Sequence, residues 1–302
     1  MAEIVITHYN KGDGMEENDG ILGVIGGSGL YRMDGLKNVR EKYMDTPFGD
    51  PSDKLVFGEI SGKKIVFIPR HGREHKILPS EINYAANIYA LKASGVKQVI
   101  SVSAVGSLDR NIKPGDIVII DQFLDFTKIR KSTFFGNGLV AHVSMAEPVC
   151  PHLREIVINS CKSLAIPHHI NGSYVCIEGP QFSTKAESFF YKNIGASVIG
   201  MTNATEAKLA REAELCYATI AMATDYDCWH EVEDNVNADM ILKILNDNAE
   251  KAKNIIKKSL EETILTETDS CCCGSSLQKS VVTEKSRVPE DTLKKLSIFN
   301  LY

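Results

Sequence analysis

The sequence predicts an α/β fold in which helices cover both faces of a mostly parallel β-sheet. From residue 21 to about residue 262, short apolar runs with the composition of strands alternate with helical patterns. The chain has 302 residues, of which 43% are hydrophobic, so it can bury a sizeable core. Alternation of this kind is typical of parallel sheets, because successive parallel strands are joined by helical crossovers.

The first strands are short and strongly apolar, and are expected at residues 21–26, 55–60 and 64–69. A helix follows, because apolar side chains recur from Ile82 to Ala93 at helical spacing before Gly95 ends the pattern. The later elements are expected as strands at 96–103 and 116–120, a helix after Pro151, a strand at 173–177, helices near 184–193 and 203–213, a strand at 215–224 and a helix at about 238–262.

The two ends of the chain differ from this central domain. We expect an N-terminal arm over residues 1–20 and a single main domain over residues 21–263. Residues 264–302 form a C-terminal segment, whose first part, 264–287, is polar and without apolar periodicity, which predicts a mobile link. From Pro289 to Tyr302 we expect a short helix and an apolar run that needs a surface to dock on.

Charge and hydropathy exclude several classes of partner. The chain has 34 basic and 39 acidic residues and no basic tract, so no nucleic acid is expected to bind. No apolar run approaches the roughly 18 residues that cross a membrane, and the N-terminus lacks a secretory pattern. We therefore expect a cytoplasmic protein whose partners are small molecules, with no membrane contact.

The eight cysteines fall into two groups. Five lie in apolar segments, where a buried thiol is the usual outcome: Cys150, Cys161, Cys176, Cys216 and Cys228. The run of Cys271, Cys272 and Cys273 forms either a flexible thiol-rich tail, a disulfide or a metal-binding element. In an ordinary cytosol we expect these thiols to be free.

Small and polar residues follow three of the expected strands at the edge of the sheet where α/β proteins bind ligands. Ser28 lies in a glycine-rich turn, Arg70 and His71 follow the strand at 64–69, and Ser103 and Ala104 end the strand at 96–103. Backbone amides, hydroxyl groups and a guanidinium suit an anion such as phosphate. A tight turn and a surface loop are the alternative interpretations of the first two segments.

The glycine-rich turn does not fit a dinucleotide-binding fingerprint. Arg32 occupies the place of the third glycine, and no second strand ending in an acidic residue follows at the required distance. A nucleotide-binding oxidoreductase is therefore disfavoured.

Asp225 and Asp227 follow a strongly apolar strand and precede the lone Trp229. At an extended strand end, positions two apart face the same side, so the two carboxylates would lie together at the mouth of the sheet. Such a pair suits a heterocycle with a ring nitrogen to protonate and an amino group to hold, as in adenine. A solvated turn or a divalent-metal site would use the same residues.

Two further strand ends supply apolar contacts. Phe182 follows the strand at 173–177 and offers a ring that can stack on a base. Met201 and Thr202 follow a strand near Val198 and add an apolar contact and a hydroxyl group.

Taken together, the motifs resemble the trimeric purine nucleoside phosphorylases, specifically their 5′-methylthioadenosine phosphorylase branch. The matching segments run in the order and spacing of that family from about residue 21 to 262, and they read VIGGSGLY, DTPFGDPSD, PRHGREH, NYAANIYALKASGV, SAVGSL, PGDIVIIDQFLD, MAEPVCP, IEGPQFSTKAES and ATDYDCW. The resemblance implies a single α/β domain whose twisted mixed sheet curls into a partial barrel, and a homotrimer with sites near the subunit interfaces.

The resemblance also implies roles for individual residues. Asp225 and Asp227 would be catalytic and would recognise adenine. Phosphate would be bound by Ser28, Arg70, His71, Ser103, Ala104 and Thr202. The nucleoside would be contacted by Gly106, Phe182, Ile199, Met201, Val236 and, from the neighbouring subunit, His142. No cofactor and no metal is expected, since inorganic phosphate is a co-substrate.

The implied reaction is phosphorolysis of 5′-methylthioadenosine to adenine and 5-methylthioribose 1-phosphate. Asp225 would protonate the departing base and Asp227 would accept a hydrogen bond from its 6-amino group. A 6-oxopurine or methylthioinosine phosphorylase and a noncatalytic nucleoside-binding protein are the alternatives.

The chain departs from the family pattern after Met201. Thr202 to Glu206 lack the proline common at this point, and Ser28 replaces a threonine common in the animal enzymes. The first change puts the rigidity of the turn in doubt, whereas the second retains the hydroxyl group.

Overall fold

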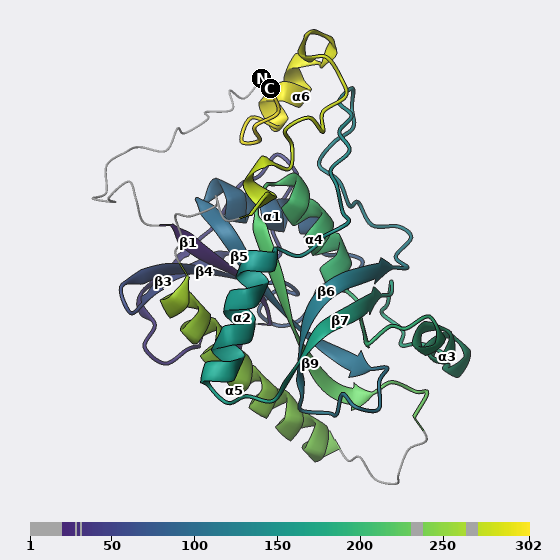
Figure 1. Ribbon diagram of the computed structural model, residues 1–302. Helices are drawn as coiled ribbons and strands as arrows, with labels where there is room; N and C mark the ends of the chain where they lie inside the picture. The colour runs from purple at the N-terminus through teal and green to yellow at the C-terminus, as the bar shows by residue number, and fades with distance from the viewer. Residues whose placement is uncertain (1–19, 28, 31, 231–237, 264–270) are drawn as a thin grey trace.

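A nine-stranded mixed sheet forms the centre of the molecule in the computed structural model, which describes residues 20–27, 29–30, 32–230, 238–263 and 271–302 (Figure 1). The strand order is β2-β3-β4-β1-β5-β8-β7-β6-β9. The strands are β1 (Ile21–Gly26), β2 (Lys37–Lys42), β3 (Leu55–Ile60), β4 (Lys63–Pro69), β5 (Val96–Ser107), β6 (Ile117–Asp125), β7 (His168–Cys176), β8 (Val198–Gly200) and β9 (Cys216–Tyr226).

An additional pairing between β5 and β9 closes one half of the sheet into a barrel of five strands, namely β5, β8, β7, β6 and β9. The parallel pairs β6–β7, β7–β8 and β5–β9 combine with the antiparallel pairs β5–β8 and β6–β9. All five strands contribute side chains to one buried apolar cluster, which includes Val105, Tyr174 and Ala221. The expected mixed sheet with a partial barrel is therefore confirmed.

The other half of the sheet is open. Its central strand β1 is buried along its whole length, as expected for an apolar strand with parallel neighbours on both sides. The edge strand β2 was not expected from the sequence, because all six of its residues are exposed and most are polar. Charged side chains on an edge strand protect it from pairing with other chains.

Four helices cover the two faces of the sheet. Helices α2 (Pro151–Ser163) and α5 (Ala238–Glu262) pack together on one face, and α1 (Tyr84–Ala93) and α4 (Asn203–Glu212) on the other (Figure 1). Helix α3 (Lys185–Asn193) lies beside the barrel. Helix starts follow the capping rules: Asn83 accepts from the backbone N–H of Ala86, and Pro151 opens α2.

The C-terminal segment folds back onto the body of the protein. It contains the 3₁₀ helices η1 (Cys273–Ser275) and η2 (Lys285–Arg287) and the short helix α6 (Glu290–Lys295). Phe299 is 5% exposed and packs against Phe134, with the two rings tilted by 45° and their centroids 4.8 Å apart. The apolar run at the C-terminus thus has the docking surface that the sequence required.

The expected mobile link is only partly described. Residues 264–270 lie outside the described residues, as does the N-terminal arm up to residue 19. From Cys271 onward the link packs against the body, with Cys273 and Leu277 each 1% exposed. No helix among the described residues is long and apolar enough to cross a membrane.

Candidate active site

The ends of three barrel strands bring the predicted base-binding residues together. Gly106 in β5 is paired with Ile199 of β8 on one side and with Asp225 of β9 on the other. A Cβ atom built on Gly106 would lie 3.3 Å from Oδ1 of Asp225 and 3.4 Å from Cβ of Asp227. It would also lie 3.1 Å from Cγ2 of Ile199. The absence of a side chain at position 106 therefore allows β5 to pack closely against Ile199 and the two aspartates.

Asp225 is partly exposed to solvent, and the preceding residue holds its carboxyl group. Its Oδ2 accepts a hydrogen bond from the Thr224 hydroxyl at 2.6 Å. The surrounding protein removes solvent from the carboxyl group and raises its pKa, and the charge of Asp227 raises it further, although the Thr224 bond acts in the opposite direction. A raised pKa keeps a larger fraction of Asp225 protonated at neutral pH, as a general acid requires.

Asp227 is buried and is positioned through its backbone. Its N–H donates to the carbonyl of Ser107 at 3.0 Å, and the same carbonyl accepts from Nε1 of Trp229 at 2.8 Å. The side chain is 8% exposed, and Oδ2 has no hydrogen-bond partner among the described residues. An unsatisfied buried oxygen costs stability, so this atom is an acceptor for a ligand's N–H group.

Arg70 directly follows β4 and is 3% exposed. Its guanidinium is paired with the carboxylate of Glu206 in α4 through Nε and Nη2. Nη1 donates to the carbonyl of Val102 at 3.0 Å, and Nη2 donates to the hydroxyl of Ser101 at 2.6 Å. Most donors of Arg70 are therefore occupied within the protein, which leaves one N–H of Nη1 for an anion.

Glu206 is a residue that the sequence did not single out. It is 2% exposed and accepts hydrogen bonds from the hydroxyl groups of Ser101 at 2.7 Å and Tyr217 at 2.9 Å. The signal that could have found it is a carboxylate among the alanines Ala204, Ala207 and Ala210 of the helix at 203–213, where a buried charge requires a partner.

His71 follows Arg70 and is half-buried. Its Nδ1 lies 2.8 Å from the carbonyl of Ile77, so Nδ1 carries the proton of this bond and, in the neutral ring, Nε2 is an acceptor. Burial and the charge of Arg70 lower the pKa of His71 to about 4. At neutral pH His71 would therefore accept a hydrogen bond from a protonated phosphate oxygen, rather than donate one as a cation.

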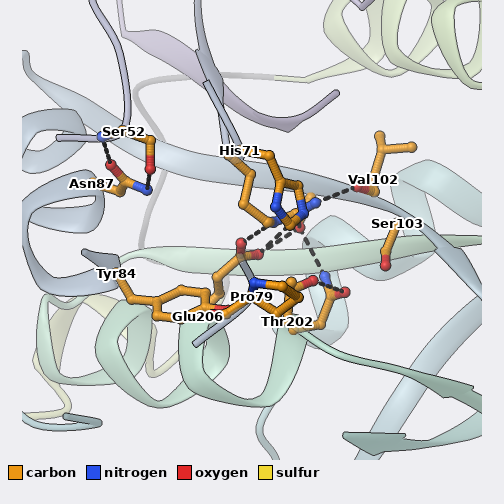
Figure 2. Close-up of polar contacts among 12 residues, drawn as sticks. Ser52, His71, Pro79, Tyr84, Asn87, Val102, Ser103, Thr202 and Glu206 are labelled. Carbon is orange, nitrogen blue, oxygen red and sulfur yellow. Dashed lines mark hydrogen bonds and ion pairs between the residues drawn. The ribbon is translucent and has the colours of Figure 1, made fainter. Parts of the chain in front are cut away.

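The other predicted phosphate ligands lie on β5 and at the start of α4. Ser103 is buried, with its hydroxyl 3.3 Å from that of Tyr174, whereas Ala104 is exposed. Thr202 precedes the first residue of α4, and its side chain makes no capping hydrogen bond. The positive end of the helix therefore lies next to the predicted phosphate ligands. Figure 2 shows Ser103, Thr202 and His71 near Glu206.

Arg130 is a second residue that the sequence did not reveal. Its buried guanidinium donates to the carboxylate and carbonyl of Glu178, the latter at 2.6 Å, and to the carbonyl of Met201. It thereby ties the segment after β7 to the segment after β8. Met201 in turn fills the space over Gly179, where a Cβ atom would lie 2.5 Å from the methionine sulfur.

Four of the predicted residues do not contribute described contacts to this site. Phe182 lies at the surface and is 85% exposed. His142 is exposed, and its backbone N–H donates to Ser280 of the C-terminal segment at 2.8 Å. Ser28 and Val236 lie outside the described residues.

Among the described residues, no third His, Cys, Asp or Glu lies close enough to Asp225 and Asp227 to complete a group of metal ligands. A hollow of about 490 Å³ is lined by residues that include Tyr84 and Arg130 but neither aspartate. The arrangement therefore suits proton transfer to a heterocyclic ring, next to an edge of the sheet that can bind an anion.

Comparison with protein families and with relatives agrees with this geometry. A profile described as the phosphorylase superfamily matches residues 21–261. The S-methyl-5′-thioadenosine phosphorylase of Geobacter sulfurreducens is 50% identical over 279 residues, which cover 92% of this chain and 97% of the relative. The protein of the same name from Hyperthermus butylicus is 51% identical over 264 residues, covering 86% and 95%.

Solved structures give the same picture. A methylthioadenosine phosphorylase from an antarctic soil metagenomic library superposes with a TM-score of 0.89 at 47% identity, covering 93% of this chain and 99% of that one. A variant of the adenosine/methylthioadenosine phosphorylase of Schistosoma mansoni, in complex with adenine, has a TM-score of 0.81 at 36% identity, covering 87% and 99%.

Proposed function

The chain belongs to the phosphorylase superfamily, and from that premise we propose that it cleaves 5′-methylthioadenosine with inorganic phosphate, giving adenine and 5-methylthioribose 1-phosphate. It is an enzyme of the pentosyltransferase class. The observation that carries the proposal is the pair Asp225 and Asp227, which both lie against Gly106, in a chain 50% identical to a methylthioadenosine phosphorylase. Adenine matches this pair in both donors and acceptors.

In the proposed mechanism the bond between C1′ and N9 breaks and its electron pair passes to the purine. Asp225 donates its proton to N7 as the negative charge develops, which its raised pKa favours. The 6-amino group donates to the unpaired Oδ2 of Asp227. A phosphate oxygen then forms a bond to C1′, and the phosphate stabilises the developing positive charge on the ribose.

Phosphate is proposed to lie among Arg70, His71, Ser103, Ala104 and Thr202, with Ser28 also contributing. The N-terminus of α4 and the accepting Nε2 of His71 support an anion that carries one proton. No cofactor takes part, because phosphate is itself the co-substrate.

An assay of adenine release tests the proposed reaction. With phosphate present, 5′-methylthioadenosine should turn over faster than inosine, and omission of phosphate should abolish release. Adenosine serves as the comparison for the 5′ substituent. A preference for inosine or methylthioinosine would contradict the assignment of the aspartates to adenine.

The contact of Arg70 with phosphate needs a variant that does not leave Glu206 unpaired. We suggest the double variant Arg70→Met/Glu206→Gln compared with Glu206→Gln alone. A charge-assisted contact contributes about 1.5–3 kcal/mol, so the KM for phosphate should rise about 10- to 100-fold. A KM within twofold of the single variant would remove Arg70 from the phosphate site.

The active form is proposed to be a homotrimer in which His142 reaches the site of a neighbouring subunit. The exposed position of His142, without a described contact to the aspartates of its own chain, supports this. Light scattering should give three times 33.3 kDa. A stable, active monomer would contradict both the trimer and the role of His142.

A further inference from the structure

Four cysteine sulfur atoms meet at the end of β9 opposite the aspartates. The Sγ atoms of Cys150, Cys216, Cys271 and Cys273 all lie within 4.8 Å of one another. Two come from the core, since Cys150 caps α2 and Cys216 begins β9, and two come from the C-terminal segment. Cys271 is half-buried and the other three are buried.

The spacing of these atoms fits a metal ion better than disulfide bonds. Zinc binds thiolate sulfur at about 2.3 Å, so four sulfurs at the corners of a tetrahedron lie about 3.8 Å apart. Sγ of Cys216 lies 3.4 Å from Sγ of Cys271, whereas the two sulfur atoms of a disulfide lie about 2.05 Å apart. All eight cysteines are free thiols in the structure.

Two donors point at the sulfur atoms. The backbone N–H of Leu153 points at Sγ of Cys150 at 3.5 Å, at the positive end of α2, and Nη1 of Arg211 donates to Sγ of Cys273 at 3.3 Å. Donors of this kind orient metal-bound sulfur and offset the excess negative charge of a tetrathiolate site.

We propose that Cys150, Cys216, Cys271 and Cys273 bind one zinc ion in a tetrahedral site that fastens the C-terminal segment to the catalytic domain. Each zinc–sulfur bond replaces one S–H bond, and the four protons pass to solvent without any change in oxidation state. Four thiolates and no open position are the pattern of a structural rather than a catalytic zinc site. The site is separate from the proposed reaction, and its test does not depend on activity.

The residue between the two tail ligands provides a matched control. Cys272 is exposed and does not belong to the group of four sulfurs. Cys272→Ser replaces one sulfur atom by oxygen in the same short segment, as the ligand variants do, but it leaves every proposed ligand in place.

The experiment uses the full chain purified under reducing conditions without chelator. Elemental analysis should find about one zinc per chain, and the cobalt-substituted protein should show the intense visible and sulfur-to-metal charge-transfer bands of a tetrahedral tetrathiolate. Cys272→Ser should keep both properties. Cys271→Ser and Cys273→Ser should lose the zinc or show a cobalt spectrum with fewer sulfur ligands.

Three outcomes would overturn the proposal. The first is reduced wild-type protein that contains no zinc and gives no cobalt spectrum, whether its thiols are free or joined as disulfides by mass spectrometry. The second is a Cys271→Ser/Cys273→Ser protein that retains one zinc per chain. The third is loss of zinc in Cys272→Ser. The wild-type measurements remain decisive even if a serine variant fails to fold.

Discussion

Strand β9 carries Asp225 near its carboxyl end, with Asp227 just beyond it, and Cys216 at its amino end, about 30 Å away at the rise of an extended strand. Around the aspartates, polar atoms remain open: Asp225 is exposed and Oδ2 of Asp227 has no described partner. Around Cys216, the C-terminal segment closes over the sulfur cluster, and Cys273 is 1% exposed.

The difference separates two uses of free energy within one strand. At the carboxyl end of β9, Oδ2 of Asp227 has no described hydrogen-bond partner and the pKa of Asp225 is raised. Both features destabilise the folded protein, but both suit the binding of a ligand. The amino end joins segments that are far apart in the sequence and serves stability. Substitutions at the two ends should therefore change different measured quantities.

The largest expected effect is that of Asp225→Asn on turnover. Removal of the general acid should lower kcat on 5′-methylthioadenosine by a factor on the order of 10² to 10⁴. The free energy of unfolding should not fall, because the substitution also removes a desolvated carboxyl group beside Asp227. Steady-state kinetics and urea denaturation of the same preparation check both parts, and an active variant or an unstable one would contradict the contrast between the two ends.

The pH dependence of the wild type has a definite sign. Asp225 must be protonated to act as the acid, so kcat should fall as the pH rises through its raised pKa. The residual activity of Asp225→Asn should lack this decrease. A decrease of equal size in both proteins would assign the titration to another group.

The second effect concerns the buried ion pair of Arg70 and Glu206, which lies next to the predicted phosphate ligands. Glu206→Gln leaves the charge of Arg70 buried without its partner and should destabilise the fold by about 3–5 kcal/mol. Denaturation with urea measures the change. A loss of stability of this size would show that a strong buried ion pair supports the predicted phosphate-binding residues.

A surface pair serves as the control for Glu206. Glu284 lies 3.0 Å from Arg287, with the two side chains 69% and 76% exposed. Glu284→Gln should change stability by less than about 1 kcal/mol. Equal effects of the two substitutions would mean that burial does not set the strength of the Arg70 pair.

Local periodicity explains which parts of the fold could be predicted. Strand β1 and helix α1 were expected from their apolar patterns, and β1 was found at the predicted bounds. Strand β2 has no apolar pattern, because it is an exposed edge held by backbone hydrogen bonds. The sequence carries little information about such a strand.

Residue placement was predictable where a single short motif carries both residues, as for Asp225 with Asp227. It was not predictable where two distant residues depend on each other. Glu206 pairs with Arg70 across 136 positions, and Cys150 meets Cys273 only after the chain has folded. The sequence showed the tail cysteines but not the two core cysteines that they join.

The third effect is the pH-dependent contribution of Glu212 to stability near the amino end of β9, the end that the C-terminal segment closes. Glu212 ends α4 next to Arg211, and accepts from the hydroxyl of Thr133 at 2.7 Å and the N–H of Phe134 at 2.7 Å. Burial nevertheless raises the pKa of Glu212 from 4.5 to about 7. The folded state therefore holds a proton that the unfolded state has lost over this range.

The sign follows from that difference in bound protons. The contribution of Glu212 to stability is fully present below about pH 4.5 and is lost as the pH rises through about 7. Glu212→Gln cannot titrate, so the stability of the variant relative to the wild type should increase by up to about 3 kcal/mol across this window. Urea denaturation at several pH values measures it, and a constant difference would contradict the raised pKa.

The smallest effect returns to the open end, at the start of α3. Thr184 caps this helix together with Glu187, and α3 packs on the site through Lys192, whose Nζ lies 3.7 Å from the centre of the Trp229 ring. Loss of a cap costs about 1 kcal/mol, which corresponds to about a fivefold change in local opening. Thr184→Ala should therefore speed amide exchange in α3 about fivefold with little change in global stability. The KM for the nucleoside should rise by a similar factor, since Phe182 lies two residues before the cap.

Asn83→Ala removes the corresponding cap of the buried helix α1, and should instead lower global stability and leave KM unchanged. If both variants lowered global stability equally and left KM alone, the open end would be as tightly coupled to the core as the closed one.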